Sequence, residues 1–543
     1  TMVNLPKPQL APFLRKQSPG TLFQENFKRF LSVGKEMFLA AFLVGCRAGP
    51  DVVFLTIDTL RVDHVGAFSS DSPARTPNID SLASDSVLFS SAYSPISVTG
   101  PAFVTLHTGM DPKEHGVVIN MFRGGVPLSS STTTLAELLL DKGYKTAAFV
   151  SGFTLHPQLN LDQGFDHYSY PPKKQARRLG KDTLAEMLDW MSWQWSGNYF
   201  VWFHTYDPHG PWDVWATEEE LAQQREKKQK KRSRRSRVGS SEKVQDEHAD
   251  EPLHVLGPKR EKDSYIYTSY RSISQKERIP KYQYIKGVEE PSFYERMYAR
   301  GVEAADNQVG AIVAQLKKEG RYDDALIVLT ADHGESFTER DLWFDHGTFP
   351  SEEQLHVPLL IKMPKRHQSG YKIDDLVAFK DILPTVLDVL KIDTPSRVTG
   401  KSLLKPDGSF SSSATSYLLG ESSHCKKEMT LQCDPLGPEG KVFSLRTPDQ
   451  SMWLSAEADK NAIWIFNSPD EAKAERFNAQ QSSRAQQQHL EILLKERSTR
   501  MESLEAIEWP QKKSDKASDS NQEAQKEKDQ DITREEELEL LKQ

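Results

Sequence analysis

Short apolar runs alternate with helical patterns from residue 51 to about residue 215. The clearest apolar runs have the length and composition of buried β-strands: Val52–Leu55, Ala147–Val150 and Tyr199–Phe203. Leu and Ala recur at helical spacing over Ser131–Lys142, and the following Gly143 is a typical helix stop. Strands that alternate with helices are typical of α/β proteins. The pattern therefore predicts a mostly parallel central sheet covered by helices on both faces.

The same alternation returns in the second half of the chain. Residues 294–318 have the apolar spacing of a long amphipathic helix. The apolar runs Ala325–Thr330 and Val357–Ile361 predict two further strands, and residues 375–390 are predicted to form a helix. Because these segments repeat the earlier pattern, we expect residues 51–405 to form one α/β domain.

The C-terminal part of the chain has a different pattern. A connection that contains Pro and Gly, residues 391–410, leads to apolar stretches that alternate with polar residues over 415–467. Such stretches predict a small antiparallel sheet, so we expect a smaller α+β subdomain over 406–470. Residues 471–543 are rich in Gln, Glu and Lys, which favours a charged tail with helical and disordered segments.

Residues 216–290 interrupt the α/β pattern. They contain the basic run Lys227–Arg237, KKQKKRSRRSR, followed by a stretch rich in Ser and Glu. This composition favours a disordered surface insertion. A binding site for anionic lipid or for a polyanionic substrate is the alternative interpretation. The sequence leaves both open.

Composition narrows the class of protein. The chain has 543 residues, of which 37% are hydrophobic and 27% are charged, and its mean hydropathy is -0.59. A globular body with solvated segments is therefore expected. The net charge of -8 argues against a general nucleic-acid-binding protein. Cys425 and Cys433 are either a disulfide across a short loop or two free thiols, and no Cys-x-x-Cys spacing is present.

The N-terminal segment, residues 1–50, resembles an export signal. Basic residues precede the apolar run Met37–Gly45, which is too short to span a bilayer. Leu43–Cys46 resembles a bacterial lipobox, in which the cysteine is lipidated and becomes the mature N-terminus. We therefore expect an extracytoplasmic protein, either periplasmic or attached to the membrane as a lipoprotein through Cys46. A short buried helix is the alternative.

Candidate metal ligands follow several of the predicted strands. Asp58 comes after the first strand, and Asp332 and His333 come directly after Ala325–Thr330. In open α/β sheets the carboxyl ends of the strands line the ligand crevice. Further acidic and imidazole groups lie in the segments 204–209 and 344–347, namely His204, Asp207, His209 and His346. Carboxylate and imidazole ligands suit a hard or borderline divalent cation, so a metal site is predicted at this edge of the sheet.

A series of motifs in this chain resembles the sulfatase family of the alkaline phosphatase superfamily. The resemblance covers residues 51–405 apart from the insertion. The matching segments are TIDTLRVDHVG (56–66), TPNIDSLA (76–83), LHTGMDPKEHGV (106–117), KGYKTAAFVSGF (142–153), GFDHY (164–168), FHTYDPHGPW (203–212), ALIVLTADHGE (325–335), FDHG (344–347) and VPLLI (357–361). The resemblance implies an alkaline-phosphatase-like fold and a hydrolase of sulfate or phosphate esters.

The resemblance also implies that Thr99 is the nucleophile. The family places a Cys or Ser nucleophile in a Cys/Ser-x-Pro-Ser-Arg motif, ten residues before the Gly of a Thr-Gly pair. Counting back from Gly109 reaches Thr99, and Pro101 matches the proline of the motif. Ala102 and Phe103 replace the family's Ser and Arg. Oxidation of a threonine would give a ketone, so Thr99 differs from the formylglycine precursors and resembles the Thr-nucleophile branches of the superfamily.

Asp58, Asp332 and His333 are the ligands that the resemblance implies for a divalent metal, with Thr99 as a fourth ligand. Such a cation, Ca²⁺, Zn²⁺ or Mn²⁺, would lower the pKa of the threonine hydroxyl. Thr59 stands at the second position of the family's usual acidic pair. The lost carboxylate argues against the single-calcium sulfatase site and favours a Zn²⁺ or Mn²⁺ site.

Three further residues are expected near the reacting ester. His209, His346 and Asp207 either neutralise its charged group, with the two histidines as catalytic residues, or bind a second metal ion. Arg61 and Lys142 are candidate substitutes for the arginine that Phe103 replaces, and both are equally consistent with surface positions.

The sequence thus predicts a sulfatase-like, metal-dependent hydrolase that acts on a small-molecule or glycan ester. A phosphodiesterase or phosphonate hydrolase of the same superfamily is one alternative, and a transferase of head groups is another. A non-catalytic binding protein that keeps the fold is the third, and Ala102 and Phe103 favour it.

Overall fold

The computed structural model describes most of the chain between residues 49 and 505. The described ranges are 49–121, 125–172, 175–194, 196–237, 279–280, 283–339, 343–410, 416–423, 442–455, 463–467, 474–476 and 483–505. The lipobox cysteine Cys46 and the pair Cys425 and Cys433 lie outside these ranges. Two compact units divide the chain, residues 1–48 with 194–197 and residues 49–193 with 198–543. Every described helix and strand belongs to the second unit, and among the described helices none has the length and apolar character that crossing a membrane requires.

The centre of the second unit is an eight-stranded sheet with the order β4-β3-β5-β1-β6-β7-β2-β8. Its strands are β1 (Val52–Ile57), β2 (Val87–Tyr93), β3 (Lys145–Val150), β4 (His167–Ser169), β5 (Tyr199–Thr205), β6 (Leu326–Thr330), β7 (His356–Lys362) and β8 (Lys372–Ala378). Only β7 runs against the others within this sheet. The predicted mostly parallel sheet is confirmed.

Strand β1 is the innermost part of the sheet. All six of its residues are buried, as expected for a continuous apolar run that is covered on both faces. Val53 pairs with Val201 of β5 on one side and with Ile327 of β6 on the other. The predicted strands around residues 52, 147, 199, 325 and 357 all belong to this sheet.

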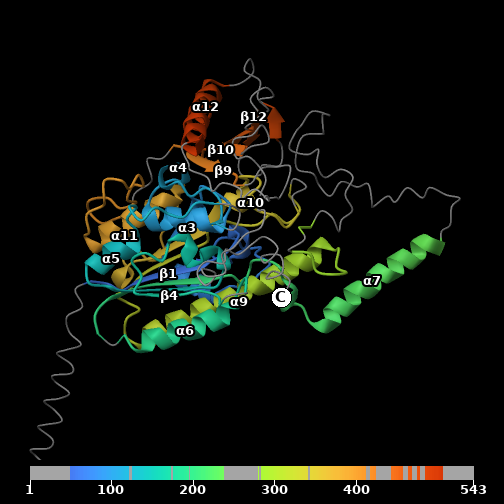
Figure 1. Cartoon of the computed structure of the whole chain (residues 1–543), viewed down its shortest axis with the longest axis horizontal. Helices are drawn as coiled ribbons and strands as arrows, with labels where there is room; N and C mark the ends of the chain where they lie inside the picture. Colours follow the sequence, from blue (N-terminus) through green and yellow to red (C-terminus); the bar gives the residue numbers. More distant parts are fainter. Residues whose placement is uncertain are drawn as a thin grey trace, which may run out of the picture. The chain divides into compact units, whose positions relative to one another are not determined.

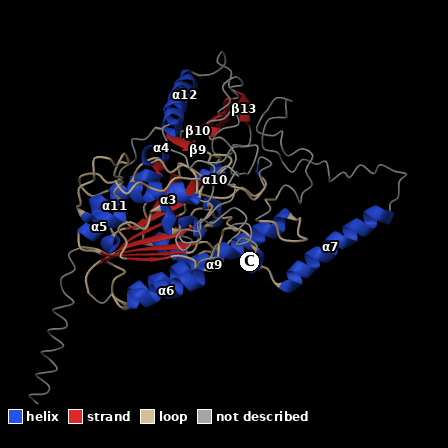
Figure 2. Ribbon diagram, in the orientation of Figure 1, coloured by secondary structure: helices blue, strands red, loops and turns tan. Residues whose placement is uncertain are grey.

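Helices cover both faces of the sheet, as Figures 1 and 2 show. Helices α6 and α9 lie below the sheet in this view, and α3, α5 and α11 lie above it. The helices of the domain are α2 (Pro77–Ser84), α3 (Thr99–Thr108), α4 (Pro112–His115), α5 (Leu135–Asp141), α6 (Gly180–Ser192), α7 (Glu218–Arg237), α9 (Pro291–Lys318), α10 (Glu352–Leu355) and α11 (Ile382–Leu390). Short 3₁₀ helices occupy Val62–His64, Phe153–Leu155, Pro157–Leu159, Asp213–Trp215, Pro364–Arg366 and Phe379–Asp381.

Local sequence signals set several of these helix boundaries. Helix α5 starts after Thr134, whose hydroxyl accepts the backbone N–H of Glu137 at 3.2 Å. The Glu137 carboxylate accepts the backbone N–H of Thr134 at 2.8 Å in return. This reciprocal capping satisfies two N–H groups that the first turn of a helix leaves without partners. The long helix predicted over 294–318 is confirmed as α9.

Two predicted segments differ from the structure. Residues 375–390 do not form one helix, because β8 extends to Ala378 and α11 begins at Ile382. The edge strand β8 pairs with β2, so long-range pairing decides the conformation of a segment whose local pattern suits a helix. Residues 218–237 of the expected disordered insertion form helix α7.

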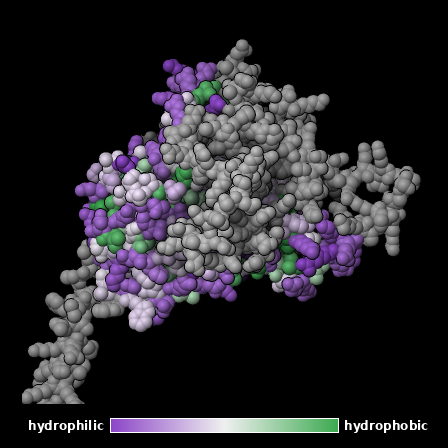
Figure 3. All heavy atoms as spheres, viewed as in Figure 1, coloured by the Kyte–Doolittle hydropathy of each residue, from purple (hydrophilic) through white to green (hydrophobic). Residues whose placement is uncertain are grey.

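Helix α7 extends from the body of the domain in Figure 1 and is coloured mostly as hydrophilic in Figure 3. Ion pairs hold it to the segment that precedes α9 and to α9 itself. Glu220 pairs with Arg300 at 2.6 Å, and Lys228 pairs with Glu289 at 2.6 Å. Helix α7 is therefore attached both to α9 and to the last residues of the insertion.

A smaller antiparallel sheet follows the main domain, as the sequence predicted. Its strands run in the order β13-β12-β11-β10-β9. They are β9 (Leu418–Glu421), β10 (Val442–Arg446), β11 (Gln450–Ser455), β12 (Ile463–Asn467) and β13 (Ala474–Arg476), and helix α12 (Arg484–Glu505) packs on the sheet. Buried Leu493 of α12 contributes to the core of this subdomain. Structure thus continues past residue 470 into the segment predicted as a charged tail.

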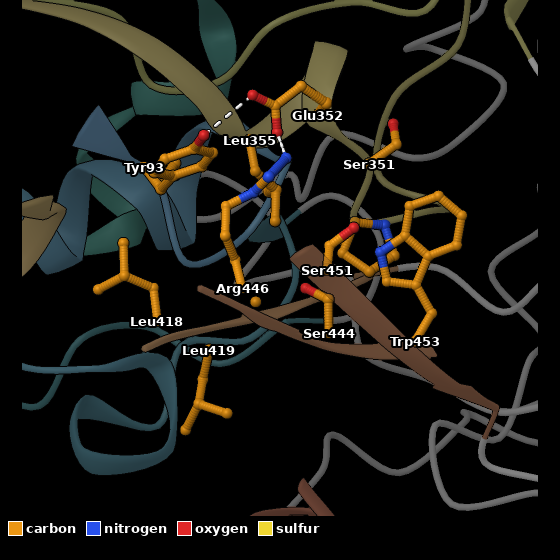
Figure 4. Close-up of a pocket in the computed structure, with 13 residues that line it drawn as sticks. Tyr93, Ser351, Glu352, Leu355, Leu418, Leu419, Ser444, Arg446, Ser451 and Trp453 are labelled. Atoms are coloured by element: carbon orange, nitrogen blue, oxygen red, sulfur yellow. Dashed lines mark hydrogen bonds and ion pairs between the residues drawn. The ribbon is translucent and has the colours of Figure 1, made fainter. Parts of the chain in front are cut away.

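Polar, aromatic and apolar side chains meet at the junction between the two sheets, as Figure 4 shows. Glu352 accepts a hydrogen bond from the Tyr93 hydroxyl at 2.9 Å and forms an ion pair with Arg446 of β10. The Arg446 guanidinium lies 4.9 Å from the centre of the Tyr93 ring. Because Tyr93 ends β2, the subdomain is attached directly to the central sheet.

Candidate active site and metal centre

The predicted site residues meet at one edge of the central sheet. Asp58 follows β1, His209 lies in the segment after β5, and Asp332 follows β6. Thr99 is the first residue of α3, the helix that comes after β2. These four strands run in the same direction, so their carboxyl ends lie at the same edge. The fold therefore places at one edge residues that are far apart in sequence.

Asp58, Asp332 and His333 form a cluster that matches a metal site. One ligand atom from each residue lies within 4.8 Å of the others, and all three side chains are buried. Three atoms of the cluster make no hydrogen bond within the described residues: Oδ1 of Asp58, Oδ2 of Asp332 and Nε2 of His333. Buried polar atoms normally have partners. The cluster therefore suits a divalent cation, which would satisfy all three atoms.

Hydrogen bonds orient the cluster. Oδ1 of Asp332 accepts the backbone N–H groups of Thr59 at 3.1 Å and His333 at 2.9 Å, which leaves Oδ2 directed elsewhere. Nδ1 of His333 lies 2.8 Å from the carbonyl oxygen of Gly334. A carbonyl oxygen only accepts, so Nδ1 carries the proton and Nε2 presents its lone pair. A Cβ at Gly334 would lie 2.0 Å from the carbonyl oxygen of Glu353, so only glycine fits here.

The electrostatics of the cluster favour a cation. Burial, followed by the charge of Asp332, raises the pKa of Asp58 well above its ordinary value. Two carboxylates this close repel each other when both are ionised.

Thr59, next to Asp58 in the chain, has a positive φ of 54°, which is strained for a β-branched residue. Its buried hydroxyl also makes no hydrogen bond to the described residues.

Thr99 is the first residue of α3, and its hydroxyl faces the cluster. Its Oγ1 donates to Oδ2 of Asp58 at 3.4 Å, and the side chain is buried. Asn120 accepts the backbone N–H of Gly100 at 2.8 Å, which orients the first turn of the helix. The positive end of the helix dipole also lies at this hydroxyl. The structure therefore brings Thr99 together with the predicted ligands.

Phe103 occupies the position of the family's arginine and lies in the core. Its ring is 5.2 Å from the Trp202 ring and perpendicular to the His204 ring at 5.1 Å. His204 in turn bridges to the cluster: the backbone N–H of Ser151 approaches its Nδ1 at 3.4 Å, and its Nε2 lies 3.2 Å from Oδ2 of Asp58. Burial lowers the pKa of His204 to about 3, so a neutral ring supports Asp58.

His346 and His209 continue the site beyond the cluster. The His346 ring is 4.6 Å from the His333 ring and 5.1 Å from the His209 ring. His209 is stacked on Tyr206 at 4.1 Å. Burial, with the neighbouring His346 as the next cause, lowers the pKa of His209 well below its ordinary value. The His346 ring therefore lies next to both the His333 ring of the metal cluster and the His209 ring.

Asp207 does not join this group. Its Oδ1 accepts the backbone N–H of Gly180 at 2.9 Å, and its Oδ2 accepts the side-chain amide of Gln308 at 2.5 Å. Both oxygens are directed to helices α6 and α9, which flank the sheet. The structure therefore assigns Asp207 to the attachment of these helices and not to a second metal or to substrate.

Arg61 and Lys142 were the predicted substitutes for the missing arginine. Neither side chain is directed at the metal cluster. Arg61 forms ion pairs with Asp63 and Glu339, both at 2.7 Å. Lys142 is exposed and precedes β3, so it lies at the amino ends of the parallel strands, opposite the site. The arginine that Phe103 replaces has no counterpart at these two positions.

Two residues that the sequence analysis did not single out complete the site. Glu335 is fully buried, and its Oε2 lies 3.2 Å from Nδ1 of His346 and 3.2 Å from Nε2 of Gln283. Burial raises the pKa of Glu335 to about 8. Its position two residues after His333 was the only available signal, and Gln283 gave none because it lies within the predicted insertion.

A family model for sulfatases matches residues 50–392. The chain is 26% identical over 361 residues to an ulvan-active sulfatase of Formosa agariphila, covering 65% of this chain and 64% of that protein. It is 23% identical over 403 residues to an N-acetylglucosamine-6-O-sulfatase of Bacteroides thetaiotaomicron, covering 65% of this chain and 70% of that protein. The chain thus spans slightly less than two thirds of the first of these relatives.

The fold is shared with solved structures. A phosphonate monoester hydrolase from Silicibacter pomeroyi superposes with a TM-score of 0.61 at 22% sequence identity, covering 84% of this chain and 97% of that chain. The alkaline-phosphatase-like architecture predicted from the motifs is therefore confirmed.

Proposed function

Because the chain belongs to the sulfatase family, we propose that it is a metal-dependent hydrolase of sulfate or phosphate esters that uses Thr99 as its nucleophile. One observation carries the proposal. Buried ligand atoms of Asp58, Asp332 and His333 lack hydrogen-bond partners among the described residues, and the Thr99 hydroxyl contacts Asp58 beside them. Two carboxylates, an imidazole and a hydroxyl form a donor set that suits Zn²⁺ or Mn²⁺ better than Ca²⁺.

The proposed reaction has two steps. A divalent cation held by Asp58, Asp332 and His333 supplies the positive charge that lowers the pKa of the Thr99 hydroxyl. Oγ1 of Thr99 attacks the sulfur or phosphorus atom, the bond to the alcohol oxygen breaks, and the hydroxyl proton leaves with the alcohol. Water then attacks the Thr99 ester, restores the hydroxyl and releases sulfate from a sulfate ester, or a phosphate monoester from a phosphodiester, with a proton.

His209 and His346 are the proposed binding groups for the charged oxygens of the ester. The His346 ring is next to the His333 ring of the metal cluster, and the His209 ring is next to that of His346. A ring N–H directed at the ester would donate a hydrogen bond to one of these oxygens. Nδ1 of His209 lies 2.6 Å from the carbonyl oxygen of Gly210, which only accepts, so His209 would donate to the ester with Nε2 only when both ring nitrogens carry a proton.

The family and its relatives decide the order of the alternatives. Sulfate esters of glycans come first, because one of the relatives is an N-acetylglucosamine-6-O-sulfatase. Phosphonate or phosphodiester hydrolysis is second, supported by the phosphonate monoester hydrolase that shares the fold. A head-group transferase would use the same Thr99 ester with an alcohol in place of water. A binding protein without activity is supported by Ala102 and by the packing of Phe103 in the core.

Turnover by nucleophile variants tests the proposal. Thr99→Ala should lower turnover of an aryl sulfate or an aryl phosphate diester at least a hundredfold, because no hydroxyl remains to form the ester. Thr99→Ser should keep measurable turnover. Thr108→Ala is the matched control, since it removes a hydroxyl on the same helix that bonds only to the carbonyl oxygen of Val104. Unchanged turnover in Thr99→Ala would exclude Thr99 as the nucleophile.

The same experiment decides the reaction class. The ratio of the two rates assigns the preferred ester, and trapping with a labelled alcohol would reveal a transferase. Metal quantitation of the wild type and of Asp332→Ala separates an enzyme from a binding protein. If neither Zn²⁺, Mn²⁺ nor Ca²⁺ binds the wild type, the metal-dependent reaction is wrong.

A further inference from the structure

The carboxyl group of Glu335 lies next to His346, one of the proposed substrate-binding residues. It is fully buried, and its Oε1 makes no hydrogen bond to the described residues. Its Oε2 contacts Nδ1 of His346 and accepts the amide of Gln283, both at 3.2 Å. A buried carboxyl with one unsatisfied oxygen is costly to keep. Its contacts therefore indicate a function in holding His346.

Gln283 comes from outside the sequence motifs of the family. It lies near the end of the long insertion, before α9, and its side chain is completely buried. A Cβ at Gly210 would lie 2.9 Å from Oε1 of Gln283, so the amide is packed against the loop that carries His209. One amide thus contacts both the His209 loop and the Glu335 carboxyl.

The segment around Gln283 is held firmly by α9. The Tyr294 hydroxyl accepts the backbone N–H of Ile285 at 3.0 Å and donates to the carbonyl oxygen of Val288 at 3.1 Å. The backbone N–H of Gln283 donates to the carbonyl oxygen of Pro280 at 2.9 Å. Gln283 therefore has a fixed position relative to the catalytic body.

We propose that Glu335 and Gln283 are positioning residues that hold His346 in the orientation that binds the charged group of the ester. This inference rests on the proposed function. The contact at Nδ1 turns Nε2 of His346 away from Glu335, and the ring contacts with His333 and His209 set the side it faces. The end of the charged insertion is thus part of the proposed site.

A double-mutant cycle with His346 tests this role. Gln283→Leu and Glu335→Gln should each raise the KM for an aryl sulfate or phosphodiester about tenfold, the scale of residues that orient a functional group. In a His346→Asn background neither substitution should have a further effect, because both act through His346. Binding of Mn²⁺ to the purified variants should match the wild type, since neither side chain contacts the metal cluster.

Gln308→Leu is the matched control for the loss of a buried amide. Gln308 holds Asp207 and does not contact Glu335. Its effect on KM should add to that of His346→Asn. If the effects of Gln283→Leu and Glu335→Gln also add to that of His346→Asn, the positioning role is wrong even where Thr99→Ala is inactive. Should Gln283→Leu fail to fold, the Glu335→Gln arm of the cycle decides the result in the same way.

Discussion

At the residue scale, burial raises the pKa of several carboxyl groups, among them those of Asp58, Glu335 and Asp381. Asp58 and Glu335 belong to the proposed site, where a cation and His346 are their partners. Asp381 lies elsewhere, and it accepts the backbone N–H of Lys401 at 2.8 Å. Its carboxyl joins the start of α11 to the connection that follows this helix. The raised pKa of such a structural carboxyl should make the stability of the protein depend on pH.

Burial raises the pKa of Asp381 to about 6. The folded state therefore binds more protons than the unfolded state between about pH 4 and pH 6, so this group's contribution to stability falls as pH rises through 6. The loss amounts to roughly 3 kcal/mol by neutral pH. Asp381→Asn should remove this pH dependence. The free energy of unfolding of the variant, relative to that of the wild type, should therefore increase as pH rises from 4.5 to 7.5. Urea unfolding at both values measures the difference, and a constant difference would contradict the prediction.

At the element scale, one ion pair fixes the three central strands at the edge opposite the site. Oδ2 of Asp51, just before β1, pairs with Arg321 at 2.7 Å, and both side chains are buried. Oδ1 of Asp51 accepts the backbone N–H of Tyr199, the first residue of β5. Arg321 lies just before β6 and its guanidinium is 4.7 Å from the centre of the Tyr199 ring. The pair therefore connects the segments that precede β1 and β6 with the start of β5.

Arg321→Met should destabilise the domain by about 3–5 kcal/mol, because it leaves the Asp51 carboxylate buried without its cation. The double variant with Asp51→Asn should recover part of that loss, since no unpaired charge remains. Unfolding in urea measures both effects. Metal affinity of the folded fraction should stay at the wild-type value because the pair lies at the opposite edge of the sheet. A double variant less stable than Arg321→Met would contradict this account of the pair.

At the scale of the whole molecule, the metal cluster couples ligand binding to folding. Asp58, Asp332 and His333 come from two different strand ends, so the cluster exists only in the folded chain. A cation that binds the folded state alone stabilises it by about 2.7 kcal/mol when its concentration is a hundred times Kd. It also offsets the repulsion between the two carboxylates.

Removing the metal should therefore lower the Tm of the wild type. Addition of Zn²⁺ or Mn²⁺ to chelator-treated protein should restore it, and Asp332→Asn should show a much smaller response. Differential scanning calorimetry with and without each cation measures the effect. An equal metal response in Asp332→Asn would place the stabilising cation elsewhere.

Lipidation of Cys46 and the extracytoplasmic location stay predictions from the sequence.

Several features of the fold follow from the sequence alone. Continuous apolar runs such as Val52–Leu55 identify the buried strands, because only a strand covered on both faces tolerates that pattern. The positions of Asp58, Asp332 and His333 directly after such strands place them at one edge of the sheet. The family motifs add Thr99, since it stands at a set distance before Gly109.

Other features were decided only by the tertiary structure. Residues 372–378 form a strand because β2 offers an unpaired edge, which no local pattern reveals. Asp207 is held by Gln308 and Gly180, and Gln283 reaches Glu335 across a long insertion; both results depend on which surfaces pack together. Sequence determined the strands and the ligand types because these are local properties. Tertiary structure decided which polar groups have partners, because hydrogen bonds between distant segments form only once the chain is folded.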